Sequence, residues 1–364
     1  MNDKKLSNQI TVLYFGTYDP EYSRNWVLID GLRKNGVNVI ECRDDSTGFK
    51  KFLKLFLKFR RIKDSYDVIV IGFFSPLIVP FAKLITLKPV IFDPLVLLYD
   101  SNVLDRKVVK LKSFRAFYYW FLDWLTLHLA DAVLLDTKEH IKYASKEYNV
   151  RPEKFKRIFI GTREDVYHPI VKTWKTDKFL VEFHGIFNTL QGVEFIIKAA
   201  KLLEPYDDIK IIIIGNGKGQ DKLLQLAQTL KIKNIEFIEP VDKKELAIKI
   251  SEADVCLGIF GTSDKARRVI PNKVYECVGM RKPVITADTP AIREFFTDDD
   301  LMLVKIADAE AIANAVLKLK QDQELRERLA NNAYTKLNSR ASTKILGLEF
   351  KEIIQELIFR TKYE

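Results

Sequence analysis

The stretch Arg268-Val-Ile-Pro-Asn-Lys-Val-Tyr-Glu276 decides the fold, because it reads as a helix start between two short apolar runs. The runs are residues 255–260 before it and 284–286 after it. Pro271 fixes the backbone φ angle, and the side chain of Asn272 can cap free N–H groups. A strand, a helix and a second strand in this order predict the repeating unit of a parallel α/β sheet.

Charged residues surround this helix start. Arg267 and Arg268 precede it, and Lys273 and Glu276 follow within its first turns. The positive end of the helix dipole and the added cations suit a phosphate group, whereas the carboxylate can bind ribose hydroxyls. A plain capped helix needs none of these cations, so the stretch predicts a phosphate site.

The same alternation of strand and helix runs along the whole chain. The runs that predict strands are residues 10–15, 37–41, 68–71, 90–92, 132–135, 157–160, 179–183, 209–214, 235–238, 255–259, 284–286 and 301–304. Continuous apolar runs indicate parallel strands buried on both faces, and 364 residues exceed one ordinary core. We expect an α/β protein with two doubly wound, Rossmann-like domains that face each other across a cleft.

We expect three segments in the chain. An N-terminal domain is placed at residues 1–168, a C-terminal domain at 169–341, and a final helix at 342–364 that crosses back to the first domain. The boundary is set near His168, where a polar stretch up to Thr176 shows no hydrophobic period.

Composition limits the partners and the compartment. The formal net charge of +10 and the pI near 9.2 suggest nucleic acid, an anionic membrane surface or a phosphorylated small molecule. No RNA-binding motif accompanies the charge, so we expect no nucleic acid. Three cysteines without a CxxC pair and a polar start at residues 1–9 predict a cytoplasmic protein without a signal peptide.

Ligands of open parallel sheets bind beyond the carboxyl ends of the strands, so the loops there hold the remaining donor-side candidates. Gly215 and Gly217 follow a strand and let backbone N–H groups approach an anion. Gly185 permits the same approach in the loop that begins at His184. For each loop a tight turn without a ligand stays open, and His184 also fits a histidine whose ring is satisfied at a strand end.

The first domain supplies the acceptor-side and catalytic candidates. Gly16, Tyr18 and Arg24 follow the first strand and can face an acceptor, with a solvated surface turn as the alternative. Asp93 and Asp100 follow a later strand, and either is a candidate general base for a hydroxyl nucleophile. The alternative is an Asx turn at Asp93 and a cap at Asp100.

Residues 49–63 form an amphipathic helical pattern, with phenylalanines on one face, lysines and arginines on the other, and no acidic residue. Two interpretations are open: a core-packed helix with a solvated basic face, and a helix that contacts an anionic membrane interface. A second aromatic pattern, at residues 114–124, is expected in the core. The four histidines show no ligand spacing, so we expect no metal.

With these residues assembled, the second half of the sequence resembles family-4-type glycosyltransferases of the GT-B fold, the glycosyl transferases group 1. The matching segments occur in order at residues 183–192, 211–217, 235–240, 253–255, 271–276 and 282–284. The first half agrees more loosely. The resemblance implies a nucleotide-sugar donor held mainly by the C-terminal domain and an acceptor held by the N-terminal domain.

The sequence departs from the family pattern at two places. Such enzymes often carry two glutamates with seven residues between them, whereas this chain has Arg268 and Glu276 at that spacing, so only the ribose-binding glutamate matches. The arginine and lysine usual in the loop after the first C-terminal strand align with Ile186 and Gln191. We therefore expect Arg268 and its basic neighbours to supply the charge that neutralises the diphosphate.

Together these features predict a metal-independent glycosyltransferase without a cofactor. It would move a sugar from a nucleotide-sugar donor to a hydroxyl of a glycan or lipid-linked acceptor, at the inner face of the membrane. Asp93, which stands where the family often has a histidine, or Asp100 would assist the acceptor. Two alternatives stay open: a GT-B nucleotide-sugar epimerase, which needs no acceptor, and a non-catalytic GT-B-like subunit, which fits the missing glutamate and loop cations.

Overall fold

The computed structural model describes residues 9–62, 65–171 and 177–363. The expected polar start at residues 1–8, the last residue of the basic helix pattern, and the end of the expected boundary stretch at 172–176 lie outside these ranges. The described strands form two six-stranded sheets in which every paired register is parallel.

The first sheet has the strand order β2-β1-β3-β4-β5-β6. Its strands are β1 (Thr11–Gly16), β2 (Asn38–Arg43), β3 (Val68–Ile71), β4 (Val90–Phe92), β5 (Ala132–Leu135) and β6 (Phe155–Arg157). Its helices are α1 (Ser23–Lys34), α2 (Lys50–Ile62), α3 (Ile78–Ile85), α4 (Phe114–Leu129) and α5 (Lys138–Tyr148), with the π-helical turn η1 (Asp100–Asp105) and the 3-10 turn η2 (Pro152–Lys154). The central strands are buried along their whole length, as expected for strands covered on both faces.

The second sheet has the order β12-β11-β10-β7-β8-β9. Its strands are β7 (Phe179–His184), β8 (Ile209–Ile214), β9 (Ile235–Ile238), β10 (Val255–Leu257), β11 (Val284–Ala287) and β12 (Met302–Val304). Its helices are α6 (Val193–Leu203), α7 (Gln220–Thr229), α8 (Lys243–Glu252), η3 (Asp264–Arg267), α9 (Asn272–Gly279), α10 (Pro290–Arg293), α11 (Ala309–Gln321) and α12 (Gln323–Ala341). The predicted α/β class with two doubly wound domains is confirmed.

Two elements differ from the sequence-based expectation. The strand expected at residues 157–160 lies earlier, at Phe155–Arg157, and the buried residues 158–160 continue toward the other domain instead. Helix α12 was not expected, because its sequence carries no broad apolar stripe. Its buried face consists largely of alanines, with Leu329 and Leu337.

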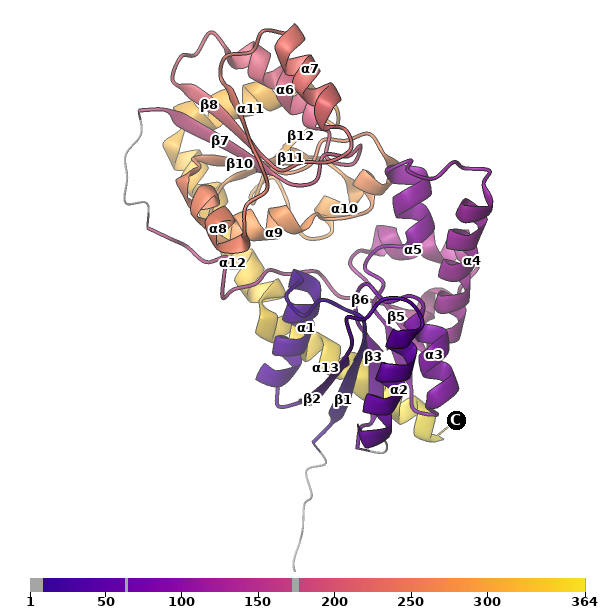
Figure 1. Ribbon diagram of the computed structural model, residues 1–364. Coiled ribbons are helices and arrows are strands. Elements are labelled where there is room, and N and C mark those ends of the chain that lie inside the picture. The colour runs from indigo at the N-terminus through magenta and orange to yellow at the C-terminus, as the bar shows by residue number, and fades with distance from the viewer. Residues whose placement is uncertain (1–8, 63–64, 172–176, 364) are drawn as a thin grey trace, which may run out of the picture.

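The last helix, α13 (Thr343–Tyr363), packs against α1 of the first sheet's domain (Figure 1). Gly31 and Gly347 permit this close approach, since a Cβ on Gly347 would lie 2.1 Å from the backbone of Gly31. Helices α12 and α13 therefore connect the two domains physically.

The domains also share buried contacts at the base of the space between them. The rings of Phe159 and Phe295 meet with centroids 4.7 Å apart, in one apolar cluster that contains residues of both halves. The carboxylate of Glu294 accepts the backbone N–H groups of Lys138 and Glu139, at the positive start of α5. These contacts between the domains keep the carboxyl ends of the two sheets facing each other.

Candidate functional site

A cavity of about 320 Å³ lies between the two domains. The loop after β7 and the start of α9 form one wall, and residues of the first domain form the other. The lining residues used below are His184, Gly185, Gln191, Lys265, Asn272, Lys273 and Glu276 from the second domain, and Tyr22, Asp105 and Asp136 from the first. The place agrees with the rule that open parallel sheets bind ligands beyond their carboxyl strand ends.

Helix α9 begins inside this cavity as predicted, but its start differs in detail. Pro271 occupies the N-cap position, and no described side chain caps the first turn. Asn272 is already helical, and its amide donates to the hydroxyl of Tyr22 across the cleft, at 3.4 Å. The N–H groups of the first turn therefore remain without a side-chain cap, which is the arrangement that suits a bound anion.

Lys273 places its ammonium group at the bottom of the cavity. Its Nζ donates to Oε1 of Gln191 at 2.6 Å and lies 3.4 Å from the ring centroid of Phe183. Burial lowers the pKa of Lys273 to about 7, although the nearby carboxylates act in the opposite direction. Gly185 makes room for this side chain, because a Cβ there would lie 2.8 Å from Nζ.

Glu276 is held by a buried chain of charged groups. His184 donates through Nε2 to Glu276, at 3.0 Å, and its Nδ1 lies 2.8 Å from Oε1 of Glu182. Burial alone would lower the pKa of His184, but the two carboxylates outweigh it and raise that pKa to about 9. At neutral pH the ring is therefore charged and donates from both nitrogens. Both ring nitrogens of His184 have partners, as the alternative of a satisfied histidine at a strand end predicts. One of these contacts orients the carboxylate of Glu276 in the cavity.

Gly215 and Gly217 do not line the cavity and support its loop instead. A Cβ on Gly215 would lie 2.0 Å from the carbonyl oxygen of Gly185, and one on Gly217 would lie 2.6 Å from that of Phe187. The loop after β8 thus packs directly under the loop after β7. Only glycines permit this approach at their positive φ angles.

Arg267 and Arg268 lie in a second cavity, of about 620 Å³. Arg268 pairs with Asp100 across the domain boundary, with Nη2 and Oδ1 2.7 Å apart, and stacks 3.6 Å from the ring centroid of Tyr143. The structure therefore commits Arg268 to Asp100 and not to the cavity of Glu276. Asp100 lines this second cavity but not the cavity of Glu276, and its ion pair with Arg268 argues against the expected role as a free base.

Arg24 and Asp93 are both fully buried and pair with each other. Nε of Arg24 lies 2.9 Å from Oδ2 of Asp93, and Nη1 donates to the carbonyl groups of Ile158 and Phe159. Burial raises the pKa of Asp93, and the guanidinium opposes that shift. The expected roles of Arg24 toward an acceptor and of Asp93 as a base do not fit this placement, because neither side chain reaches solvent.

Gly16 and Tyr18 are also absent from the cavity wall. Tyr18 is buried and donates its hydroxyl to Glu41 at 3.0 Å, while a Cβ on Gly16 would lie 2.9 Å from Oγ of Ser75. Tyr22, four residues after Tyr18 and just before α1, lines the cavity in their place. The loop after β1 thus contributes to the site through a residue that the sequence pattern did not single out.

Two further residues were not expected from the sequence, Lys265 and Asp105. Both line the cavity of Glu276 and the second cavity, so the two cavities adjoin at these side chains. Burial lowers the pKa of Lys265 and raises that of Asp105. Oδ1 of Asp105 has no hydrogen-bond partner among the described residues. No local pattern marks either residue, because η1 and η3 come together only through the approach of the two domains.

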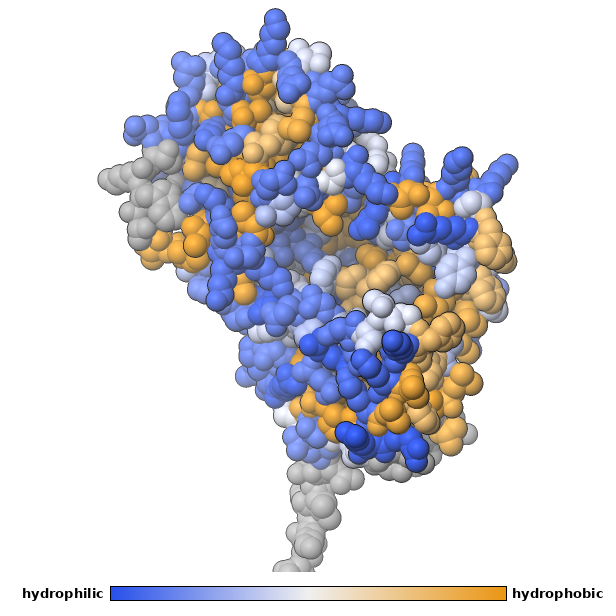
Figure 2. Space-filling model, viewed as in Figure 1, coloured by the Kyte–Doolittle hydropathy of each residue, from blue (hydrophilic) through white to orange (hydrophobic). Residues whose placement is uncertain are grey.

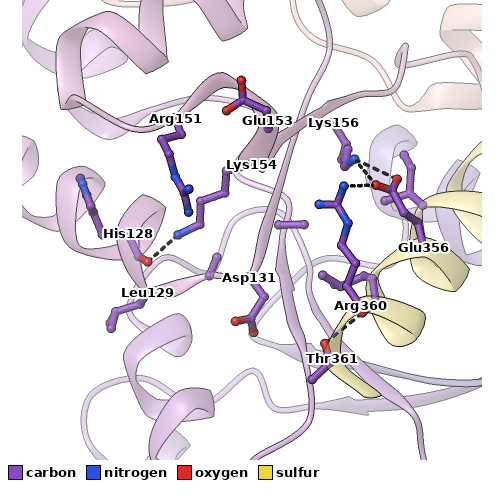
Figure 3. A pocket seen from close by; sticks show the side chains of 14 residues that line it. His128, Leu129, Asp131, Arg151, Glu153, Lys154, Lys156, Glu356, Arg360 and Thr361 are labelled. Atoms are coloured by element: carbon purple, nitrogen blue, oxygen red, sulfur yellow. Dashed lines mark hydrogen bonds and ion pairs between the residues drawn. The ribbon is translucent and has the colours of Figure 1, made fainter. Parts of the chain in front are cut away.

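A third cavity, of about 580 Å³, lies between the end of α4, the strands β5 and β6, and α13 (Figure 3). Several of its charged side chains already have partners within the cavity wall. Lys156 and Arg360 both form ion pairs with Glu356, and Lys154 donates to the backbone carbonyl of His128. It adjoins the amino-terminal ends of β5 and β6, the opposite edge of the sheet from the cleft. We therefore do not assign the site to it.

Behind the first cavity, Glu182, Cys256 and Cys277 bring one carboxylate and two thiols within 4.8 Å of one another. All three are buried, and none of them lines the cavity. Burial raises the pKa of both thiols, which favours their neutral form.

Comparison with known proteins agrees with this geometry. Residues 168–336 match the family model described as glycosyl transferases group 1. An uncharacterized glycosyltransferase of Methanocaldococcus jannaschii is 23% identical over 246 residues, which cover 56% of this chain and 58% of that relative. The alpha-D-kanosaminyltransferase of Streptomyces kanamyceticus is 25% identical over 50% of this chain and 46% of its own length. The chain thus spans about half the length of these two relatives.

The O-antigen chain mannosyltransferase C of Escherichia coli is 22% identical over 77% of this chain and 73% of its own length.

Solved structures share the fold over nearly the whole chain. HepE of Anabaena, in complex with UDP and glucose, has a TM-score of 0.69 at 15% identity and covers 96% of this chain and 100% of its own. A sucrose-phosphate synthase of Thermosynechococcus elongatus has a TM-score of 0.72 at 16% identity, covering 97% and 100%. The predicted resemblance is confirmed: the chain has the GT-B fold, and its residues 168–336 match the model of the glycosyl transferases group 1 family.

Proposed function

We propose that this protein is a glycosyltransferase that binds a nucleotide-sugar donor in the cavity of Glu276. The observation that carries the proposal is the placement of Glu276, Lys273 and the uncapped start of α9 on one wall, facing the first domain. The carboxylate of Glu276 suits ribose hydroxyls, whereas the ammonium group of Lys273 and the uncapped N–H groups suit a diphosphate. The family of the second domain and the transferase names of its relatives support transfer over the epimerase and the non-catalytic subunit.

In this proposal the donor's charges meet fixed partners. The N–H groups at the start of α9 and the ammonium of Lys273 stabilise the charge that develops on the nucleoside diphosphate as the sugar leaves. Glu276 accepts hydrogen bonds from the ribose hydroxyls. His184 holds Glu276 in position and also pairs with Glu182, so its positive ring lies between the two carboxylates. Lys273 thus takes the role that the sequence pattern suggested for Arg268.

We propose that the acceptor approaches through the second cavity. It adjoins the donor cavity at Lys265 and Asp105, so an acceptor hydroxyl there can reach the sugar. Asp105 is the carboxylate that we assign to accept the proton of that hydroxyl, because it lines both cavities and its Oδ1 has no hydrogen-bond partner among the described residues. Burial raises its pKa, and a hydrogen bond with Ser263 acts in the opposite direction. The acceptor is a glycan or a lipid-linked sugar, and Arg267 and Lys107 on this wall suit a negatively charged one.

We also propose that transfer requires no metal ion. Lys273, the start of α9 and Lys265 supply positive charge along the cavity, and the group of Glu182, Cys256 and Cys277 lies behind it. The test is transfer or nucleotide binding in the presence of EDTA. Activity restored only by Mg²⁺ or Mn²⁺ would contradict this part of the proposal.

Glu276→Gln tests the donor site directly. A glutamine keeps the shape and can still accept from His184, but it loses the charge that strengthens the ribose hydrogen bonds. We expect nucleotide affinity to fall by about tenfold to a hundredfold, since a hydrogen bond to a charged group contributes about 1.5–3 kcal/mol. Calorimetry with UDP, GDP and ADP measures the change.

The matched control is Glu310→Gln at the exposed start of α11, which should bind nucleotide as the wild type does. If the wild-type protein binds none of the three nucleotides, the proposal is wrong and a non-catalytic role is favoured. If the donor alone yields an epimerised nucleotide sugar, the isomerase alternative is correct.

We further propose that α2 contacts an anionic membrane surface. The helix places Phe52, Leu55 and Phe59 toward α3 and the sheet, and it exposes its basic residues. Among the described helices, none has the length and hydropathy to cross a bilayer, so contact would be peripheral. Lys50→Glu, Lys54→Glu and Arg61→Glu together should lower binding to anionic vesicles by about tenfold or more, at about 1 kcal/mol per lost cation.

Lys58 stays unchanged in this variant because it pairs with Asp44. The control carries Lys222→Glu, Lys231→Glu and Lys318→Glu, three exposed lysines of the second domain with the same total charge change. Equal loss of vesicle binding in both variants would mean that net charge, and not α2, determines binding.

A further inference from the structure

The aromatic helix α4 is exposed, contrary to the expectation that residues 114–124 lie in the core. Phe114 is 85% exposed, Phe117 60% and Phe121 42%. The helix turns a different face inward, where the buried residues include Ala116, Leu122 and Leu127. The prediction that the aromatic side of α4 faces the core is therefore wrong. Small and aliphatic residues form the side of α4 that packs against the core.

The exposed rings form a continuous ladder along one side of α4. Phe117 and Phe121 stack with centroids 6.3 Å apart, and Phe121 and Trp124 stack at 5.8 Å. Trp124 then meets the ring of His128 at 4.6 Å. A ladder of this kind covers its own inner atoms but leaves the outer ring faces in water.

Helix α4 belongs to a layer of three helices on one face of the first sheet. Phe52 of α2 meets Phe81 of α3 with ring centroids 5.3 Å apart, and α3 in turn packs against α4. The outer surface of this layer is apolar over a wide area, which Figure 2 shows in orange at the lower right. Its exposed apolar side chains include Phe49 just before α2, Leu53, Phe56 and Leu57 of α2, Leu84 of α3, Leu87 just after α3, and the ring ladder of α4. Soluble monomers rarely expose connected apolar surface of this extent without a partner.

Positive charge is concentrated in two segments of this surface. Residues 106–122 contain Arg106, Lys107, Lys110, Lys112 and Arg115 and no acidic residue. The charged residues among residues 47–62, in and before α2, are likewise all lysines and arginines. Lysine is depleted from the cores of protein interfaces, whereas aromatic residues beside lysines suit the headgroup region of an anionic bilayer.

We propose that α2 and α4 form a single membrane-binding platform, in which the aromatic ladder of α4 inserts among anionic lipid headgroups. The lysines of α2, and those of residues 107–112 just before α4, contact the lipid phosphates. The platform leads directly to the second cavity, because Lys107 lines that cavity and η1 precedes α4. A lipid-linked acceptor would then reach Asp105 from the bilayer surface. This last step rests on the proposed function, whereas the platform itself does not.

The test is flotation of the full-length protein with phosphatidylcholine vesicles that contain or lack phosphatidylglycerol. We expect binding to the anionic vesicles only. Phe114→Ser, Phe117→Ser and Phe121→Ser together should lower the partition constant by about tenfold or more, because the variant lacks three rings that would be buried in the bilayer interface. The control replaces Leu202, Ile248 and Leu348 with serine, three apolar residues elsewhere on the surface that are 45%, 45% and 46% exposed, and it should bind as the wild type does.

Tryptophan fluorescence provides a second measurement. Trp120 and Trp124 both lie on α4, so anionic vesicles should shift the emission to shorter wavelength in the wild type and not in the α4 variant. The variant should keep the wild-type melting temperature and nucleotide affinity, which separates this proposal from the donor site. Unchanged vesicle binding by the variant would overturn the platform. So would a wild-type dimer that the variant makes monomeric, since a second copy would then be the occupant.

Discussion

Replacing Lys273 with methionine is expected to lower kcat/KM for sugar transfer by about two to three orders of magnitude, the usual cost of removing one preorganised charge-stabilising group. Methionine fills a similar volume beside Phe183 and Gln191, so the surrounding core should keep its packing. The change removes the ammonium group from the wall that we assign to the diphosphate. Transfer kinetics with the preferred nucleotide sugar provide the measurement.

The pH dependence of donor binding gives this prediction a distinct signature. With a pKa of about 7, Lys273 is mostly neutral at pH 8 in the unliganded protein. A bound diphosphate favours the charged form, so binding at pH 8 should take up a proton and affinity should fall as pH rises from 7 to 9. Calorimetry in two buffers of different ionisation enthalpy measures the uptake. Lys273→Met should abolish it and Lys222→Met, at an exposed site, should not. Wild-type binding without proton uptake would contradict the assignment.

Replacing Arg24 with methionine is expected to destabilise the N-terminal domain by about 3–5 kcal/mol, because it leaves the carboxylate of Asp93 buried without its partner. Two carbonyl groups, of Ile158 and Phe159, lose their donor at the same time. A loss of this size is a large part of a typical domain's stability. Urea unfolding followed by circular dichroism measures it as a lower midpoint.

A double variant distinguishes the buried pair from general damage at this position. Arg24→Met with Asp93→Leu removes both charges, and apolar replacements of a buried pair are often neutral or stabilising. We expect the double variant to recover most of the stability that the single variant loses. A single variant as stable as the wild type would show that Asp93 is neutral in the folded protein.

The arrangement of strands and helices follows closely from local sequence. Continuous apolar runs mark the buried parallel strands, and periodic runs mark the helices that pack on them. Helix α9 begins where Pro271 and Asn272 indicate. Where the pattern was weak the prediction was wrong, as at α12, whose buried alanines contribute little hydrophobic contrast. At α4 the pattern was strong and misleading, since the aromatic stripe faces outward.

The candidate site was only partly predictable. Lys273, Asn272, Gly185 and Glu276 come from one helix start and one loop, and both lie at the carboxyl end of the second sheet, where topology alone brings them together. Lys265 and Asp105 come from opposite domains. Their meeting depends on how the domains approach, which local periodicity does not record.

The amino-acid sequence by itself determined that this chain forms two parallel α/β domains, and it predicts that the start of α9 binds an anion. Helix dipole, uncapped N–H groups and nearby cations act over a few residues, so they can be read from the chain. Only the tertiary structure decided which cations remain available. Arg268 pairs with Asp100 and Arg24 with Asp93, because buried charges require partners, and Lys273 is left facing the cavity. The phosphate site that the stretch from Arg268 to Glu276 predicts is therefore assigned to the second half of that stretch.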